Sequence, residues 1–284
     1  MISAIIVNYR AGKILIHCLN SIKDQVDEII VVNHSPGEDL FPIIQKFPNT
    51  KIINRPNKGY ASGCNLGAKM ASGDLLLFMN PDTMAFPDTV NILIETTKKY
   101  HSATAPKFLN PDFTFQPSTR MFPSIKHILV SRTSPLRVFL KNSKMEKEYF
   151  GYSLKKQEEP IPLKECFPLG GFFVVPRSIF ESLEGFDERF FLFFEDADFF
   201  KRLLKSGYSI IYDPRARIIH FHGFSRKNSA FKSEFHKLRS FFLYTIKHSQ
   251  SQFEKILVLL LTLTYGLIVA FRYFINIPIK ESQW

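Results

Sequence analysis

Short apolar runs alternate with amphipathic segments along the first hundred residues of this chain. Four of the apolar runs have the length and composition of buried strands: 3–9, 28–33, 51–54 and 74–80. Segments with the apolar spacing of helices lie between them: 14–23, about 40–47, and 60–71. This alternation predicts an α/β fold with a mostly parallel central sheet and helices on both faces. Right-handed connections then place the loops that follow the strands along one edge of the sheet, where ligands bind.

The regular pattern weakens near residue 110 and returns near residue 167. We therefore predict a main unit over 1–225, with a first half, an irregular proline-rich insertion and a second half at 1–109, 110–166 and 167–225. The elements predicted in the second half are a strand with a helix at 167–180, a helix at 195–205, and strands at 209–213 and 217–221. The C-terminal part, 226–284, is predicted to hold a basic amphipathic helix (226–250) and an uncharged apolar run (256–271).

Composition and charge narrow the classes of function. Hydrophobic residues make up 45% and charged residues 22% of the 284 positions, which is typical of a folded protein. The formal net charge of +11 suits nucleic acid, a phosphate-rich substrate or an anionic membrane. Residues 226–284 contain nine Lys or Arg and three Asp or Glu beside the apolar run, which favours a membrane over nucleic acid. The three separated cysteines favour a reducing cytoplasmic setting, and the N-terminus is predicted to be a strand rather than a signal peptide.

The loop FMNPDT, residues 78–83, carries a candidate metal ligand. Asp82 follows the fourth predicted strand on the ligand edge of the sheet. A hard carboxylate in this place suits Mg²⁺ or Mn²⁺ shared with a diphosphate. The alternative is a simple turn, because Asn-Pro-Asp-Thr is favourable turn chemistry.

The loop NKGYASGCNLG, residues 57–67, carries three glycines between a strand and a helix. Gly59 permits close approach by a ligand, and Asn65 offers that ligand a hydrogen bond. Gly63 and Gly67 are four residues apart, so they share a helix face that packs closely on the sheet. Packing alone is the alternative explanation, since the spacing matches neither a Walker loop nor a dinucleotide fingerprint.

The stretch FFLFFEDADFF, residues 190–200, surrounds three carboxylates with phenylalanine. Glu195 and Asp196 fall at the start of a predicted helix, whose dipole and free N–H groups keep a carboxylate ionised as a base. Capping of the helix is the alternative, and it needs only one acid. His220 ends the last predicted strand, in IIHFHGFS, where it is either a metal or phosphate ligand or a structural histidine.

Together these segments resemble inverting family 2 glycosyltransferases in the order and spacing of their motifs. The matching motifs are VNYR, NKGYASGCNLG, NPD, LGGFFVVPRSIFESLEGFDERFFLFFEDADFFKRLLKSGY and IIHFHGFS. The resemblance covers about residues 1–250, its most specific part is 169–208, and it is strongest to the rhamnosyltransferase-like branch that builds bacterial surface polysaccharides. It implies a GT-A (nucleotide-diphospho-sugar transferase) fold with the catalytic domain over 1–225.

The resemblance also implies roles for the matching positions. A nucleotide-sugar donor is expected to contact Asn8, Tyr9, Asn33, Asn57, Gly59, Asn65, Asn80 and Asp82. A divalent cation, Mg²⁺ or Mn²⁺, is expected at Asp82 and His220, the base at Asp196 with Glu195 beside it, and the acceptor at Gly170, Gly171 and Asp198. One position departs from the family pattern, because Asn33 in VVNHS replaces the Asp that normally accepts the N3–H of uracil or thymine. An amide oxygen accepts more weakly than a carboxylate, so nucleotide affinity or base choice is expected to differ.

The implied reaction moves a sugar from dTDP-rhamnose or a UDP-sugar to a hydroxyl of a glycan or lipid-linked glycan, with inversion. Asp196 would take the hydroxyl proton, the cation would neutralise the leaving diphosphate, and the phenylalanines of 190–200 would form a dry wall against the sugar rings. Two alternatives stay open. One is a catalytically inactive sugar-binding or scaffold relative, because Asn33 departs from the pattern, and the other is a nucleic-acid-binding protein.

The C-terminal part is expected to attach the protein, peripherally or by shallow insertion, to the cytoplasmic face of the inner (plasma) membrane. Its uncharged run at 256–271 is shorter than the ~20 residues that span a bilayer as a helix. Packing as a core helix or in a dimer interface is the alternative, which leaves homo-oligomerisation open.

Overall fold

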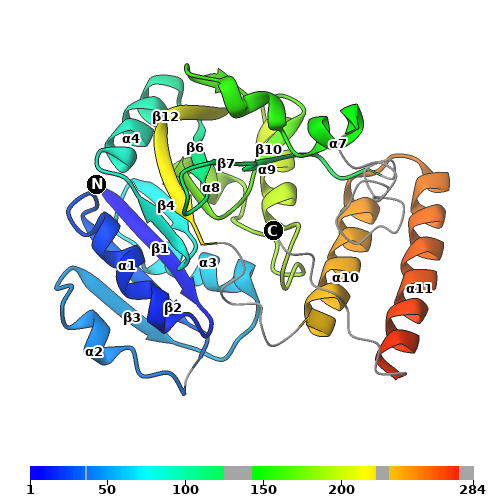
Figure 1. Cartoon of the computed structure of the whole chain (residues 1–284), viewed down its shortest axis with the longest axis horizontal. Coiled ribbons are helices and arrows are strands. Elements are labelled where there is room, and N and C mark those ends of the chain that lie inside the picture. The colour runs from blue at the N-terminus through cyan, green and yellow to red at the C-terminus, as the bar shows by residue number, and fades with distance from the viewer. Residues whose placement is uncertain (36, 125–142, 222–229, 275–284) are drawn as a thin grey trace.

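The computed structural model describes residues 1–35, 37–124, 143–221 and 230–274 (Figure 1). Its central sheet contains β1 (Ile2–Asn8), β2 (Glu28–Asn33), β3 (Thr50–Asn54), β4 (Leu75–Met79), β5 (Thr83–Ala85), β6 (Ala103–Leu109), β7 (Phe115–Gln116), β9 (Ile161–Pro162), β11 (Phe172–Pro176) and β12 (Ile210–His220). The order along its main path is β3-β2-β1-β4-β11-β6-β12-β5. Strands β3, β2, β1 and β4 pair in parallel, as do β6 and β12, whereas β11 runs antiparallel to β4 and β6. The predicted α/β fold with a mostly parallel sheet is confirmed.

Helices cover both faces of this sheet. One face carries α1 (Gly12–Ile22), α2 (Phe41–Ile44) and α4 (Thr89–Tyr100), and the other carries α3 (Tyr60–Met70), α8 (Arg177–Ser182) and α9 (Glu195–Lys205). The reason is the two-residue period of a strand, which points successive side chains to opposite faces. In β1, Ala4 and Ile6 pack in the cluster of α1 and α4, whereas Ile5 and Val7 pack in the cluster of α3 and α9.

The helix face of Gly63 and Gly67 meets the sheet as predicted. A Cβ atom on Gly67 would lie 2.4 Å from Cγ2 of Ile5, and one on Gly63 would lie 2.8 Å from Cγ2 of Val7. Both distances are far below an ordinary contact between carbon atoms, so only glycine permits α3 to lie this close to β1.

The two strands predicted at 209–213 and 217–221 are one strand, β12, with a register shift between Asp213 and Arg217. Pro214 has no N–H for the ladder, which favours an irregularity at this point. The side chain of Asp213 turns inward and binds Nη2 of Arg215 at 2.7 Å and Oγ1 of Thr96 at 2.6 Å. These bonds hold the bulge, so the strand continues instead of ending.

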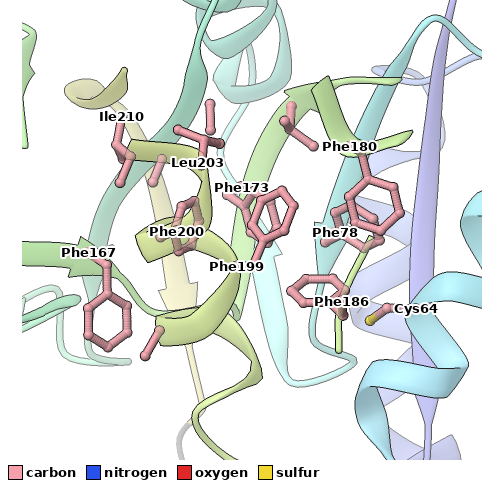
Figure 2. Close-up of a cluster of buried hydrophobic side chains, with 14 of the residues drawn as sticks. Cys64, Phe78, Phe167, Phe173, Phe180, Phe186, Phe199, Phe200, Leu203 and Ile210 are labelled. Carbon is pink, nitrogen blue, oxygen red and sulfur yellow. The ribbon is translucent and has the colours of Figure 1, made fainter. Parts of the chain in front are cut away.

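Three of the six phenylalanines in the stretch 190–200 lie in the core and cannot form the predicted wall for sugar rings, which stays a prediction only for the half-buried Phe191, Phe193 and Phe194. Phe190, Phe199 and Phe200 are at most 1% exposed. Figure 2 shows Phe199 and Phe200 among rings that come from β4, β11 and α8, and Phe173 of β11 lies 5.0 Å from Phe200 between ring centroids. Edge-on and tilted ring pairs of this kind fill the layer between the sheet and α9.

The insertion contains short elements, of which β7 and β9 join the central sheet. They are β7, β8 (Thr119–Met121), α7 (Lys144–Tyr149), the 3₁₀ turn η1 (Tyr152–Lys156), β9 and β10 (Cys166–Pro168). Strands β8 and β10 form a separate antiparallel pair, and α9 packs on β10. Residues 125–142 of the predicted insertion lie outside the described residues.

The C-terminal segment forms two long helices, α10 (Ala230–His248) and α11 (Gln252–Phe274), which lie side by side in Figure 1. Helix α10 joins the main unit, since Oγ of Ser240 donates to the carbonyl of Leu192 at 2.9 Å and Tyr244 enters the core of α3 and α9. The predicted helix at 226–250 is thus confirmed from residue 230 onward. Within the described residues, no helix is both long enough and apolar enough to cross a membrane.

Candidate active site

Glu195 and Asp196 begin α9, and their surroundings act differently on the two carboxyl groups. Glu195 is 6% exposed, and its Oε2 has no hydrogen-bond partner among the described residues. Burial, together with the charge of Asp196, raises the pKa of Glu195 well above its usual value, which favours its protonated form.

Asp196 is half-buried and accepts two backbone hydrogen bonds, from Gly170 N–H to Oδ2 at 2.9 Å and from Ala197 N–H to Oδ1 at 2.8 Å. Burial raises the pKa of Asp196 as well, but these bonds and the charge of Arg120 oppose the rise. A carboxylate whose pKa is raised in part and that stays accessible has the properties of a general base.

A turn of two glycines lies between Asp196 and the NPD loop. A Cβ atom on Gly170 would lie 3.1 Å from Cβ of Asp196, and one on Gly171 would lie 3.2 Å from Nδ2 of Asn80. The N–H of Asn80 donates to the carbonyl of Gly171 at 2.8 Å, and the hydroxyl of Tyr60 donates to the carbonyl of Gly170 at 3.2 Å. The turn therefore brings the candidate base next to the candidate donor loop, and larger residues would separate them.

Asp82 and His220 meet on the other side of this turn, although 138 residues separate them in sequence. Nε2 of His220 lies 3.5 Å from Oδ1 of Asp82, and both residues are less than 8% exposed. Two side chains at this spacing can bind one cation, and the oxygens of a diphosphate and water would complete the shell that Mg²⁺ and Mn²⁺ require. The described residues hold no cluster of three or more metal-binding side chains, so an ion at this place needs such outside ligands.

Gln116 fixes the orientation of the His220 ring. Its Nε2 donates to Oδ1 of Asn110 at 2.8 Å and to the carbonyl of His220 at 3.2 Å. The amide oxygen of Gln116 therefore faces Nδ1 of His220, at 2.7 Å, and accepts its proton. Nε2, which faces Asp82, then carries the lone pair that a metal ligand needs. No motif or periodicity pointed to Gln116, because it lies in the irregular insertion.

Asn33 is fully engaged with protein partners. Its Oδ1 accepts from Nδ2 of Asn8 and the N–H of Ser35, both at 3.0 Å, and its Nδ2 donates to Oδ1 of Asn54 at 2.9 Å. The predicted acceptance of a base N3–H by Asn33 would require one of these bonds to break. Glu38 joins the same network, since Oε2 accepts from Nδ2 of Asn8 at 2.8 Å, and it supplies a carboxylate that the motif comparison missed.

The loop before α3 contacts protein where a ligand was predicted. Gly59 has φ +103°, and a Cβ atom there would lie 2.6 Å from the carbonyl oxygen of Phe191, so the close approach is made by protein backbone. Asn65 donates to the carbonyl of Phe186 at 2.8 Å and accepts from its N–H at 2.9 Å. Asn57 accepts from the N–H of Gly59 at 2.9 Å. Tyr9 is exposed, with the guanidinium of Arg10 5.2 Å from its ring. Donor contacts at these positions stay predictions.

Asp198 does not belong to the site, which corrects its predicted role with the acceptor. It is 0% exposed and binds Nε of Arg202 at 2.9 Å, Nζ of Lys247 at 2.7 Å and Nε2 of His248 at 2.8 Å. Two residues along a helix amount to about 200°, so Asp196 and Asp198 point to nearly opposite sides of α9. Asp198 therefore stabilises the contact between α9 and α10 through its bonds to Lys247 and His248.

Comparison with known proteins places this architecture in a family. The model of glycosyl transferase family 2 matches residues 3–183, and the model described as the N-terminal domain of galactosyltransferase matches residues 149–226. The chain belongs to glycosyl transferase family 2, within its rhamnosyltransferase-like members.

Curated relatives include three rhamnosyltransferases. The N-acetylglucosaminyl-diphospho-decaprenol L-rhamnosyltransferase of Mycobacterium tuberculosis is 28% identical over 216 residues, 70% of this chain and 68% of the relative. The O-antigen chain rhamnosyltransferase RfbN of Salmonella typhimurium is 25% identical, over 79% of this chain and 67% of the relative. Rhamnosyltransferase WbbL of Escherichia coli is 26% identical, over 86% and 92%.

Solved structures show the GT-A fold at low sequence identity. GalNAc-T7 with UDP, GalNAc and Mn²⁺ matches with a TM-score of 0.60 and 15% identity, over 80% of this chain and 44% of that chain. TarS of S. aureus (residues 1–349, with UDP) matches with a TM-score of 0.53 and 14% identity, over 99% and 76%.

Proposed function

We propose that this glycosyltransferase moves a sugar, with inversion, from a nucleotide-diphosphate donor to a hydroxyl of a glycan or lipid-linked glycan in surface-polysaccharide synthesis. The observation that carries the proposal is the two-glycine turn 170–171, with Asp196 on one side and Asn80, of the loop that leads to Asp82, on the other. Such a reaction needs a base beside the attacking hydroxyl and a cation site beside the leaving diphosphate, and the turn separates two candidates for these roles.

In this mechanism Asp196 takes the proton of the acceptor hydroxyl while that oxygen attacks the anomeric carbon. The hydrogen bond from Gly170 N–H fixes the carboxylate, and protonated Glu195 adds no second negative charge beside it. Asp82 and His220 would hold the divalent cation, which supplies charge neutralisation of the leaving diphosphate. Attack opposite the diphosphate inverts the anomeric carbon in one step.

The donor is proposed to be dTDP-rhamnose or a UDP-sugar, and a panel of nucleotide sugars tests this. We expect thermal stabilisation by one donor in the presence of Mn²⁺, followed by transfer to a product of opposite anomeric configuration by NMR. A retained configuration would contradict the mechanism. Thermal stabilisation by a donor without transfer to any lipid-linked or free glycan would favour the alternative of an inactive sugar-binding relative. The hydrogen bonds that occupy Asn33 also support this alternative.

We also propose that α11 rests on the cytoplasmic surface of an anionic membrane. Five large apolar side chains at helical spacing form one exposed face, here called the α11 stripe: Phe253 (75% exposed), Ile256 (59%), Leu260 (53%), Leu263 (56%) and Leu267 (71%). Val258, on the far side of the helix, is 0% exposed. An apolar stripe of this size on a segment with an excess of positive charge suits the interface of an anionic bilayer.

Sedimentation with vesicles tests the membrane proposal. Full-length protein should sediment with phosphatidylglycerol vesicles, and the double variant Leu260→Glu, Leu263→Glu should stay in the supernatant. Phe41→Glu is the matched control, because Phe41 is 68% exposed on α2, outside the stripe. Equal sedimentation of the stripe variant and the control would contradict the proposal, and a stripe that forms dimers in the absence of lipid would assign it to a second copy of the chain.

A further inference from the structure

Arg120 lies on the face of the β8–β10 pair that α9 covers. It sits directly opposite Phe167 in the antiparallel ladder, and Phe167 is buried in the core of α9. Phe122, two residues further along the chain, shares this face and stacks on Phe167 with 5.2 Å between ring centroids. Nζ of Lys201, on α9, lies 4.5 Å from the ring of Phe122. Two cations and several aromatic rings therefore gather between α9 and the β8–β10 pair.

The guanidinium of Arg120 is positioned but only partly bonded. It lies 4.5 Å from the ring centroid of Phe150, and its Nη1 donates to the carbonyls of Pro117 at 3.1 Å and Thr119 at 2.6 Å. In the described part of the chain, Nε and Nη2 have no hydrogen-bond partner, and they are not sealed inside the core. Stacking and the two carbonyls thus hold the group while its Nε–Nη2 edge stays available for an anion.

Arg120 also lacks the carboxylate that comparable arginines have. Arg189, Arg202 and Arg215 each pair with an aspartate, at 2.6, 2.9 and 2.7 Å. No carboxylate of the described residues forms such a pair with Arg120, and residues 113–142 contain no Asp or Glu at all. Burial lowers the pKa of Arg120 to about 10, so it is still charged at neutral pH. The nearby charge of Asp196 compensates this half-buried cation only in part, because no hydrogen bond joins the two groups, and an incoming anion would compensate it further.

Arg120 lies close to the proposed base, so an anion bound there would belong to the acceptor substrate rather than to the donor. The β8–β10 pair leads directly to the base, since the N–H of Leu169 donates to the carbonyl of Ser118 at 2.8 Å and the next residue, Gly170, donates to Oδ2 of Asp196 at 2.9 Å. The charge of Arg120 therefore acts on Asp196, which is the group proposed to face the acceptor hydroxyl. Tyr149 and Tyr152 lie near Arg120, and Tyr152 is 45% exposed, so its ring is accessible to a sugar. Asp82 and His220, where the donor diphosphate is proposed to bind, lie across the two-glycine turn from Asp196.

We propose that Arg120 binds the phosphate or diphosphate that links the acceptor sugar to its lipid carrier. This deepens the proposed function and rests on it. A planar guanidinium whose Nε–Nη2 edge is open matches two phosphate oxygens in a bidentate way, and Lys201 adds a second positive charge nearby. The enzyme would thereby prefer a lipid-diphosphate acceptor to a neutral glycoside that carries the same sugar.

The test compares Arg120→Gln with the full-length wild type on two acceptors, the sugar as a polyprenyl diphosphate and as a neutral alkyl glycoside, in the pH-independent range of activity. We expect KM for the diphosphate acceptor to rise at least ~10-fold more than KM for the glycoside, the usual effect of losing a charged hydrogen bond. Arg120→Lys should recover part of the preference. Arg217→Gln is the matched control, because Arg217 lies over Phe86 at 5.1 Å, at a different edge of the sheet.

Several outcomes would overturn the proposal. An equal loss on both acceptors would mean that Arg120 acts only through the charge of Asp196, and a loss of donor affinity by calorimetry would assign it to the donor. Binding of inorganic pyrophosphate in the presence of EDTA separates this site from the reaction: wild type and Arg217→Gln should bind it, and Arg120→Gln should not. If wild type binds pyrophosphate through Arg120 but glycosylates neither acceptor, the proposed function fails while the anion site stands. If Arg120→Gln binds pyrophosphate as wild type does, the anion site is refuted.

Discussion

Asp198→Ala should destabilise the protein strongly, because Asp198 joins three cationic or polar partners at a fully buried position. Breaking a buried ion pair by removal of one partner costs about 3–5 kcal/mol. In the variant, Lys247 would still pair with Asp187 at 2.7 Å, and Arg202 would still donate to the carbonyls of Leu183 and Gly185. We therefore expect the free energy of unfolding to fall by an amount near the lower limit, about 3 kcal/mol. At about 2–4 °C per kcal/mol for a protein of this size, the melting temperature should fall by about 6–12 °C.

The assay is thermal and urea unfolding followed by circular dichroism, with Glu148→Ala as the control. Glu148 pairs with Lys144 at 3.8 Å on an exposed helix, so its loss should change the free energy of unfolding by less than ~0.5 kcal/mol. Burial alone would raise the pKa of Asp198, but His248, Arg202 and Lys247 outweigh it and hold the pKa below its usual value. The stabilisation is therefore present above about pH 4 and is lost as the pH falls further. A loss under 1 kcal/mol at pH 7, or a raised acceptor KM with unchanged stability, would refute the assignment of Asp198 to the α9–α10 contact.

Three further variants test other parts of the account. Asp82→Ala should abolish metal-dependent binding of the nucleotide diphosphate, measured by calorimetry with and without Mn²⁺, because a hard cation loses its only carboxylate among the proposed ligands; unchanged metal dependence would make Asp82 a turn residue. Gly67→Ala should cost about 1–3 kcal/mol in urea unfolding, since the new methyl meets Ile5, whereas Gly266→Ala, with nothing within 4 Å, should cost nothing. Asn33→Asp should lower stability by about 1–3 kcal/mol without tighter nucleotide binding, since the carboxylate cannot donate to Asn54; a gain in affinity would show that the amide replaces a base-binding acid.

The periodicity of the sequence was enough to predict the strands β1 to β4 and the helix α9, because each of these elements has one strongly apolar face or lies wholly inside the core. The periodicity was insufficient to predict the role of Asp198. The sequence shows three acids in one helical turn, but only the position of α10, fifty residues later, decides which of them faces a cation.

Arg120 and Gln116 show a second limit. Both lie in the proline-rich insertion, where no period marks an element, and their roles depend on long-range contacts with α9 and β12. The phenylalanines of 190–200 show a third limit of prediction from the sequence. Their number hinted at a ligand surface, yet the space between the sheet and α9 is filled by rings, and packing explains those of α9 itself (Figure 2).

In the proposed mechanism Asp196 is the ionised base and its neighbour Glu195 is protonated, and a pair of isosteric variants separates these two roles. Transfer and donor binding are measured for Asp196→Asn and Glu195→Gln under the same conditions. Asp196→Asn should lose at least ~10²-fold in kcat with donor affinity close to wild type, because a base acts on the acceptor. Glu195→Gln, which replaces a neutral acid by a neutral amide, should stay within a few-fold of wild type. Near wild-type turnover by Asp196→Asn, or a large loss confined to Glu195→Gln, would contradict the account.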